Sequence, residues 1–202
     1  MAIWRPMTER DLPGVMRVAD EIHRALPERE VVFRERLRLF PEGCMVLVTE
    51  EGQEEGQEKE EDEEKDKGQE GTAPDGSGGG GGGVGGYVVS FPIRRGRPPG
   101  LDQLLEGGAI AADADQYYVH DVAVLPALRG RGAAARAVTR LLDTVARRFP
   151  TTCLISVYGT APFWARFGFA PEPLGDDADA DALRHKLRGY GPDATYLVRR
   201  NV

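Results

Sequence analysis

Cysteine is scarce in this chain, and long apolar runs are absent. The 202 residues include two cysteines, Cys44 and Cys153. Each lies in an apolar run without a second cysteine at metal-ligand spacing, so both are predicted to be buried, reduced thiols, and no metal site is predicted. No run approaches the roughly 18 apolar residues of a membrane span, and the charged start lacks the apolar stretch of a signal peptide. We therefore expect a soluble, cytoplasmic protein, with access to the nucleus left open.

An excess of positive charge is also lacking. The formal net charge is -7, but residues 51–83 carry 12 Asp and Glu against three Lys, which leaves the remainder at +2. Binding to nucleic acid or to a membrane surface depends on clustered Lys and Arg, so neither is predicted. Residues 51–83 end in polyglycine and cannot bury enough apolar surface to offset their ordering entropy. We expect a disordered insert in a hairpin loop of a single domain, residues 1–202.

The rest of the chain alternates between strand-like and helix-like segments. Strands are predicted over residues 3–5, 44–49, 87–91, 117–124, 152–157 and 194–199. Helices are predicted after a capping box at Thr8 and Asp11, and over residues 30–40, 132–149 and 161–167, with a short one near 101–106. The main elements follow the order β-α-α-β-β-β-α-β-α-β. Hairpin-connected strands in the middle of this order predict a mixed α/β sheet rather than a regular doubly wound one. The long connection 92–116 is expected to cover a site.

A glycine-arginine turn is the most informative local feature. The strand that ends at Val124 runs through Arg129, Gly130, Arg131 and Gly132 into an amphipathic helix. The N-terminus of such a helix presents unpaired N–H groups and a positive dipole end, which suit a pyrophosphate. No Lys-Ser/Thr pair follows, which excludes a Walker-type loop, and neither G-x-G-x-x-G nor the G-x-S-x-G elbow of serine hydrolases occurs. Alone, the turn is equally consistent with a simple connection.

Three stretches together resemble the GCN5-related N-acetyltransferase (GNAT) superfamily. Residues 129–134 resemble its R/Q-x-x-G-x-G/A acetyl-CoA motif, residues 162–169 resemble its F-Y-x-x-x-G-F signature, and residues 3–12 resemble its first strand and helix. The resemblance implies an α/β fold with a GNAT-type mixed, mostly antiparallel sheet of six to seven strands, flanked by about four helices. It also implies a splay between the strands that end near Val124 and Val157.

The resemblance further implies acetyl-CoA as co-substrate and direct transfer of the acetyl group to a primary amine, without an acyl-enzyme. The residues that it assigns to acetyl-CoA are Val122, Ala123, Val124, Arg129, Gly130, Arg131, Gly132, Ala133, Ala134, Ala135, Phe163 and Trp164. The expected acceptor is a small amine, an arylalkylamine or a polyamine, and the expected state is a monomer or homodimer. A protein or peptide N-acetyltransferase and a non-catalytic acyl-CoA-binding module remain alternatives.

His120 is the predicted general base, because the unperturbed pKa of histidine is near neutral pH. Its placement resembles one of the paired histidines of arylalkylamine N-acetyltransferases, whose first histidine falls on Tyr118 here. A structural role for His120 stays open. Strand alternation puts Tyr118 and His120 on one face and Asp121 on the other, so a direct His-Asp dyad would need a bulge, and Asp121 is interpreted as structural.

The sequence leaves the proton donor to the leaving thiolate open. Trp164 stands where many GNAT enzymes have a tyrosine, and an indole N–H cannot supply a proton as a phenol does. Tyr158 and Tyr118 are the candidates, and the thiolate could also leave unaided, since an ordinary thiol has a pKa near 8.5. His23 and His185 show no partner at useful spacing and are assigned no role.

Overall fold

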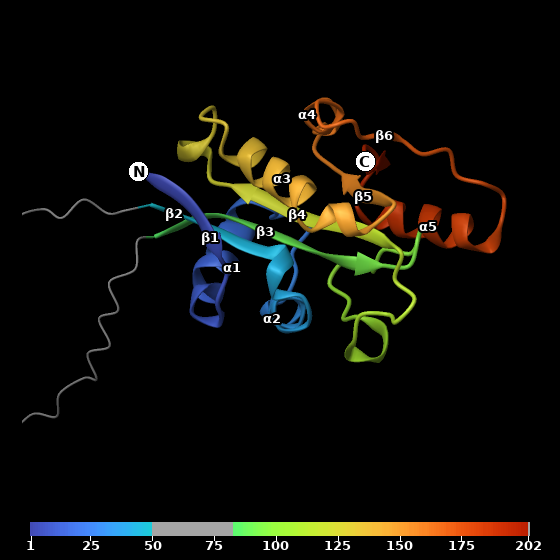
Figure 1. Ribbon diagram of the computed structural model, residues 1–202, viewed down its shortest axis with the longest axis horizontal. Coiled ribbons are helices and arrows are strands. Elements are labelled where there is room, and N and C mark those ends of the chain that lie inside the picture. The colour runs from blue at the N-terminus through green and yellow to red at the C-terminus, as the bar shows by residue number, and fades with distance from the viewer. Residues whose placement is uncertain (50–82, 202) are drawn as a thin grey trace, which may run out of the picture.

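The computed structural model describes residues 1–49 and 83–201, and these form a seven-stranded sheet with helices on both faces (Figure 1). The strands are β1 (Ala2–Pro6), β2 (Cys44–Thr49), β3 (Val84–Ile93), β4 (Gln116–Val124), β5 (Thr151–Ser156), β6 (Ala170–Pro171) and β7 (Thr195–Arg200). Their order is β1-β2-β3-β4-β5-β7-β6. All neighbours are antiparallel except β4 and β5, which run parallel. The predicted mixed, mostly antiparallel sheet is therefore confirmed. The expected insert lies outside the described residues, apart from Gly83.

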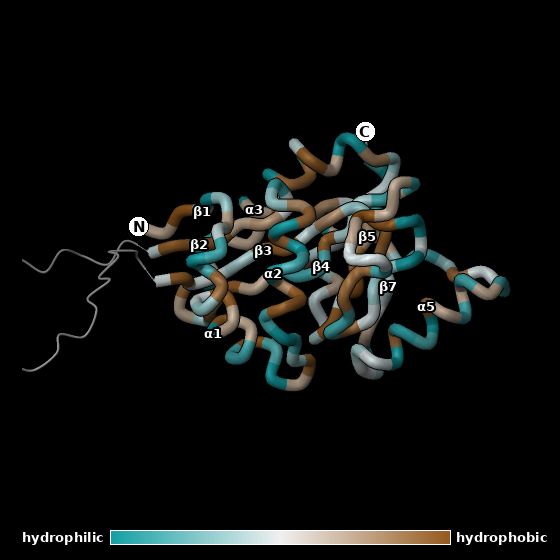
Figure 2. Tube along the Cα trace, turned by 90° about the horizontal axis from the view of Figure 1, so that it is seen from below, coloured by the Kyte–Doolittle hydropathy of each residue, from teal (hydrophilic) through white to brown (hydrophobic). Residues whose placement is uncertain are grey.

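The helices divide the core into two layers. They are α1 (Leu12–Ile22), α2 (Glu30–Leu39), α3 (Ala133–Asp143), α4 (Ala161–Ala165) and α5 (Ala178–Gly189). Helices α1, α2 and α5 pack on one face of the sheet, against side chains such as Tyr87 and Phe91, and α3 and α4 pack on the other, against Val88 and Tyr117. Hydrophilic and hydrophobic segments alternate along α5, as expected for a helix with one buried side (Figure 2).

Several predicted element boundaries were wrong, for local reasons. The helix predicted over 132–149 ends at Asp143, because the backbone of Thr144 is not helical, with φ -115° and ψ -84°. The Thr144 hydroxyl donates to the carbonyl of Arg140 at 2.7 Å. The short helix predicted near 101–106 is absent: Asp102 has a left-handed φ of 55°, and the nearest helical turn is a single 3-10 turn at Glu106–Gly108.

Strand β6 and helix α5 were not predicted at all. Strand β6 has two residues, too few for an alternation signal. The sequence before α5 does contain an N-cap residue, Asp177, which could have indicated the start of the helix. Its carboxylate accepts a hydrogen bond from the N–H of Ala180 at 2.8 Å.

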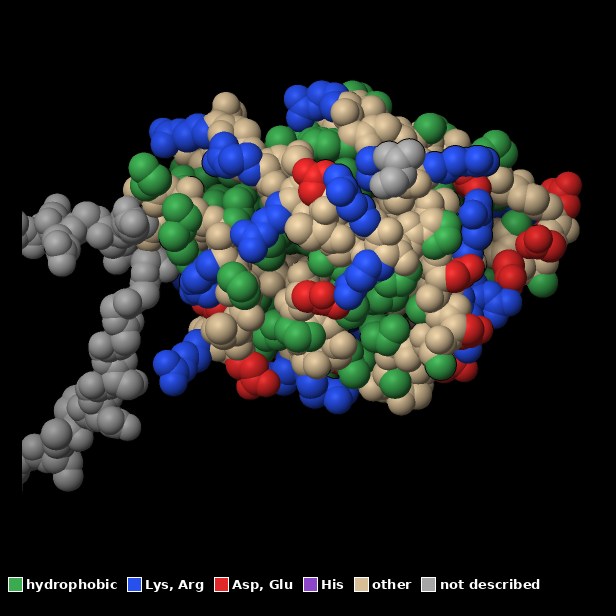
Figure 3. Space-filling model, in the orientation of Figure 1, with side chains coloured by type: hydrophobic (Ala, Val, Ile, Leu, Met, Phe, Trp, Pro, Cys, Tyr) green, Lys and Arg blue, Asp and Glu red, His purple; other side chains and the backbone are tan. Residues whose placement is uncertain are grey.

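Two other local predictions are confirmed, the capping box and the two buried cysteines. The capping box forms, with the Thr8 N–H donating to Asp11 Oδ2 at 2.7 Å. Cys44 and Cys153 are free and buried. Within residues 1–49 and 83–201, no helix has the length and hydrophobicity needed to cross a membrane. On the face seen in Figure 3, basic and acidic side chains are interspersed.

Candidate active site

Strands β4 and β5 separate part-way along their length. They pair only from Gln116 and Thr151 to Tyr118 and Cys153, although β4 continues to Val124 and β5 to Ser156. The predicted splay is thus confirmed. Beyond the last pair, the facing edges of the two strands are unpaired, and they border a cavity of about 820 Å³. Backbone groups on such edges are available to a ligand.

The glycine-arginine turn forms one end of this cavity. Gly130 and Gly132 have φ values of 76° and 72°, and a Cβ added at Gly130 would meet nothing within 4 Å. Helix α3 begins directly after the turn, with Arg136 donating its N–H to the carbonyl of Gly132 at 3.0 Å. The amides of residues 133–135 therefore have no helical acceptor and point out of the N-terminus. This open cradle of amides at a positive dipole end fits a pyrophosphate.

Most of the sequence-predicted site residues lie on the cavity wall. They are His120, Val122, Ala123, Val124, Arg129, Gly130, Gly132, Ala133, Ala134, Ala135, Tyr158, Phe163 and Trp164. Two predicted residues do not line it. Tyr118 is completely buried beside the cavity, and Arg131 is exposed, with its carbonyl bonded to the Arg136 guanidinium at 2.7 Å. Trp164 packs edge-on against Phe163 and Phe169, which is the arrangement of an aromatic wall.

A β-bulge at His120 changes the expected side-chain directions. Val89 pairs with Asp121 but Ser90 pairs with Val119, so β4 holds one extra residue between these pairs. Asp121 contacts Tyr87 and His23 on the α1 face, the face that also holds Tyr118. The strand-alternation prediction, which placed Asp121 opposite Tyr118 and His120, is therefore wrong. Bulges are frequent beside active sites because they re-aim a side chain in this way.

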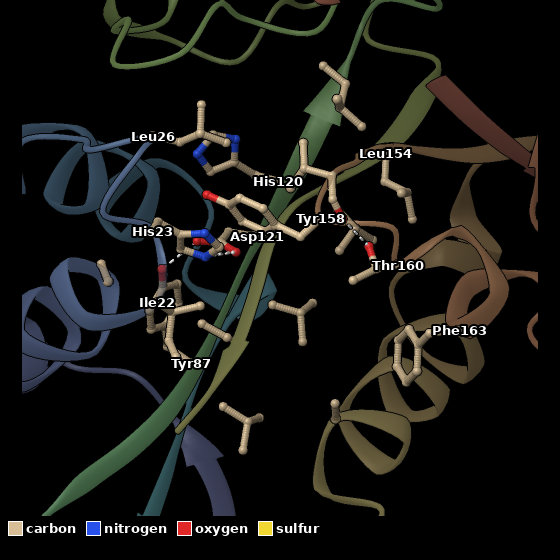
Figure 4. Close-up of a pocket in the computed structure, with 18 of the residues that line it drawn as sticks. Ile22, His23, Leu26, Tyr87, His120, Asp121, Leu154, Tyr158, Thr160 and Phe163 are labelled. Carbon is tan, nitrogen blue, oxygen red and sulfur yellow. Dashed lines mark hydrogen bonds and ion pairs between the residues drawn. The ribbon is translucent and has the colours of Figure 1, made fainter. Parts of the chain in front are cut away.

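Two histidine-carboxylate pairs line the cavity, and the bulge turns the carboxylate of one of them, Asp121, towards α1. His23 Nε2 lies 3.0 Å from Asp121 Oδ1 (Figure 4). His120 Nε2 lies 2.8 Å from Glu28 Oε2. His23 and Asp121 have side chains 16% and 15% exposed, whereas those of His120 and Glu28 are 3% and 7% exposed. His120 thus pairs with Glu28 and not with Asp121. The prediction that His23 has no role overlooked a partner 98 residues away.

The charges of these groups follow from their surroundings. Burial alone would raise the pKa of Asp121, but the His23 ring and the Tyr87 hydroxyl bonded to it hold that pKa below its usual range. Burial would also raise the pKa of Glu28, and the His120 ring and the Asp102 N–H lower it. Both carboxylates are therefore ionised near neutral pH. The pKa of His23 is raised, because Asp121 and Glu28 outweigh its desolvation.

Tyr158 completes the site from the β5 side. It has a left-handed φ of 55°, followed by Gly159 at 67°, and its ring stacks on the His23 ring at a centroid distance of 5.8 Å. Figure 4 shows it reaching from the end of β5 towards the histidines. A strained backbone at a cavity wall is typical of a functional position.

Comparison with known proteins agrees with this geometry. Residues 24–169 match the model of the acetyltransferase (GNAT) family. The chain belongs to this family. It is therefore an N-acetyltransferase, and like other GNAT enzymes it uses acetyl-CoA as co-substrate. The unpaired strand edges and the amide cradle fit that molecule. Comparison with curated protein sequences gives no match.

Solved GNAT structures share the fold at low sequence identity. The NatC complex bound to Gag peptide and CoA aligns at a TM-score of 0.59 and 15% identity, over 100% of this chain and 99% of that one. Ard1 from Thermoplasma volcanium gives 0.58 and 13%, over 100% and 98%. N-acetylglutamate synthase from Neisseria gonorrhoeae gives 0.57 and 17%, with this chain covering 35% of the synthase. At such identities the likeness supports the fold alone.

Proposed function

We propose that this GNAT enzyme acetylates a small primary amine with an apolar body, and that an arylalkylamine suits it better than a polyamine. The supporting observation is the lining of one half of the cavity, which we call the acceptor half. It is formed by the end of α1, the turn that follows α1, and the residues that face them across the cavity. Its members are Asp20, Ile22, His23, Leu26, Pro27, Glu28, Phe33, Tyr87, Leu101, Asp121, Tyr158 and Tyr190.

Apart from His23, the ionisable side chains of the acceptor half with a charge at neutral pH are carboxylates. These are Asp20, Glu28 and Asp121, whereas the arginines among the described lining residues, Arg129 and Arg166, come from the α3 and α4 side. An ammonium group is attracted to such a wall, and a substrate carboxylate finds no arginine or lysine among the described residues of this half. Amines without a carboxylate are therefore favoured over amino acids.

The remaining lining is apolar or aromatic. Leu26, Phe33 and Leu101 face the same cavity as the ring of Tyr190, so a hydrocarbon or aromatic body gains burial there. A polyamine would place a second charged nitrogen against this surface at a desolvation cost. The lining thus favours a single cationic end and an apolar remainder.

Several bonds hold the segments of this wall together. Arg29 binds Asp102 through its N–H at 2.8 Å and its Nε at 2.7 Å, and the Asp102 N–H donates to Glu28 Oε1 at 2.9 Å. Lys186 of α5 donates to the carbonyl of Pro98 at 2.5 Å. The turn after α1, the 94–115 connection and α5 are therefore joined around the acceptor half. A joined wall favours a compact acceptor over an extended peptide.

In the reaction, the amine must lose a proton before it attacks the thioester carbonyl, and the CoA thiolate must leave. Tyr158 is suited to protonate that thiolate, because its phenol stays protonated at neutral pH. Partial burial raises the pKa of the phenol, and the nearby charges of Asp121 and Asp193 raise it further. His120, predicted as base, and His23 are the histidines that line the cavity. Each remains a candidate for the proton acceptor at this point.

Protein N-terminal acetylation is the competing function, since the NatC complex with its Gag peptide shares the fold. Steady-state release of CoA thiol from acetyl-CoA, measured with arylalkylamines, polyamines, amino acids and N-terminal peptides, separates the two. We expect kcat/KM to be highest for arylalkylamines and lowest, among the small acceptors, for amino acids. A preference for peptides over every small amine would contradict the proposal.

A further inference from the structure

The two histidines of the cavity differ in what their second ring nitrogen can reach. His120 Nδ1 is sealed from solvent and has no hydrogen-bond partner among the described residues. His23 Nδ1 also has no partner there, but it is not sealed from solvent, and His23 lines the cavity. A general base must come within hydrogen-bond reach of the proton that it removes. His23 meets this requirement as the structure stands, and His120 does not.

The tautomer of His23 follows from its partner. Asp121 is ionised and accepts only, and it already receives the Tyr87 hydroxyl on its other oxygen. The hydrogen on the His23 ring therefore sits on Nε2, which donates to Asp121, and Nδ1 carries the lone pair. A carboxylate that holds one imidazole nitrogen in this way orients the ring and stabilises the imidazolium that forms when the other takes a proton.

We propose that His23 is the general base of the acetyl transfer and that Asp121, turned towards α1 by the bulge, positions it. The proposal rests on the function proposed above. Two fixed backbone elements support the geometry. His23 ends α1, with its N–H bonded to the carbonyl of Ala19 at 2.7 Å, and Asp121 is held in the middle of the sheet. Tyr158 covers one face of the His23 ring.

The proton and electron count closes without further reagents. The substrate ammonium gives one proton to His23 Nδ1, and the freed amine lone pair forms the bond to the thioester carbon. The C–S bond then breaks, and its electron pair leaves on sulfur. The thiolate receives a proton from Tyr158, which regains one from the amide nitrogen as that nitrogen loses its second proton. His23 finally releases its proton to solvent.

The charged groups around His23 determine the pH response. Burial lowers the pKa of His23, and so does Arg129, but Asp121 from β4 and Glu28 from the turn after α1 outweigh them and raise that pKa above the ordinary 6.5. Tyr87 and Tyr158 also lie beside the pair, and both have raised pKa values. His120 is a further titratable group that acts on Asp121. Since the base must be neutral, activity falls as pH drops through the pKa of His23. Removing the Asp121 charge should move this acid limb to lower pH.

The test measures kcat/KM from pH 5 to 10 for wild type and for His23→Gln, Asp121→Asn and His120→Gln. His185→Gln is the matched control, because His185 is the third histidine of the chain and is exposed on α5. Acetyl-CoA affinity and thermal unfolding are measured for each variant to separate loss of catalysis from loss of fold. The acceptor is the best one that wild type turns over.

We expect His23→Gln to lower kcat/KM at pH 7 by about 10²- to 10⁴-fold with acetyl-CoA affinity unchanged, and to recover at high pH, where the amine is already neutral. Asp121→Asn should lower the rate and move the acid limb to lower pH. A loss on this scale in His120→Gln, with His23→Gln within threefold of wild type, would overturn the proposal. If wild type acetylates only peptides, the small-amine function fails while the same variants, assayed with peptide, still test His23. Wild type that turns over no acceptor overturns both.

Discussion

Replacing Gly132 with alanine should separate the two roles of the glycine-arginine turn, its backbone shape and its space for a ligand. Gly132 caps α3 with φ 72° and ψ 13°. A Cβ added there would come no closer to the rest of the protein than 3.4 Å, at Arg136 Nη1. The substitution therefore causes no internal clash, and its cost to folding is the left-handed backbone, about 1–2 kcal/mol for an alanine.

Gly107 is a close match outside the cavity. It has φ 66° and ψ 8°, and a Cβ added there would meet nothing within 4 Å. Gly107→Ala should lower the free energy of unfolding by the same 1–2 kcal/mol or so. For a chain of this length, both variants should lose roughly 2–4 °C in Tm per kcal/mol. Equal loss of stability in the two proteins shows that the backbone effect has been matched.

Acetyl-CoA affinity should then differ between the two. Gly132 lines the cavity beside the open first-turn amides, so an added methyl group occupies the space through which phosphate oxygens reach them. Losing one hydrogen bond to a charged group costs about 1.5–3 kcal/mol, which is on the order of a 10- to 100-fold rise in Kd. Gly107→Ala should leave Kd unchanged. Isothermal titration with acetyl-CoA measures both, and an unaltered Kd in Gly132→Ala would refute the amide-cradle argument.

Three further predictions concern stability and reactivity. Gly43→Ala should unfold at much lower temperature than wild type in a thermal scan, because its Cβ would lie 2.1 Å from a backbone carbonyl oxygen. The pKa of Asp11 is lowered, since its bonds to Arg5 and Thr8 outweigh burial, so its contribution is present above the unfolded pKa and is lost as pH falls through the folded one. The stabilities of wild type and Asp11→Asn, measured by urea unfolding, should therefore differ at pH 7, and the difference should shrink as pH falls below about 4, the ordinary pKa of an aspartate. Burial raises the pKa of Cys44 and Cys153 to about 12, so a thiol reagent should label neither until the protein is unfolded.

The parts of the site that could be predicted from the sequence are those with local signals. The strand to Val124, the glycines at 130 and 132 and the helix after them are contiguous, so their order alone indicates the phosphate turn. Phe163 and Trp164 of the aromatic wall are also adjacent in the sequence, so a local motif could indicate them. Each of these features depends on residues a few positions apart, where turn and helix-start rules apply.

The residues proposed for acid-base chemistry cannot be found by such local rules. His23 and Asp121 are 98 positions apart, and Glu28 and His120 are 92 apart. A single sequence contains no local motif that connects residues so far apart. The bulge at His120 is equally hidden, because only the pairing of β4 with β3 reveals the extra residue. Without the bulge, Asp121 would face α3 and His23 would lose the carboxylate to which it is bonded.

Strand β4 therefore combines three tasks along its nine residues. Its first third pairs with β5 and holds the sheet together, and its middle carries the bulge and the residues proposed for acid-base chemistry. Its last third pairs with β3 but not with β5, and it leads into the phosphate turn. At about 3.3 Å per residue, the six steps from Tyr118 to Val124 span roughly 20 Å. This order places the carboxylates at the end proposed for the acceptor and the free amides at the end that fits an anion. One bulge in one strand thus gives His23 the carboxylate that the proposed base requires, while the sheet that carries the bulge stays intact.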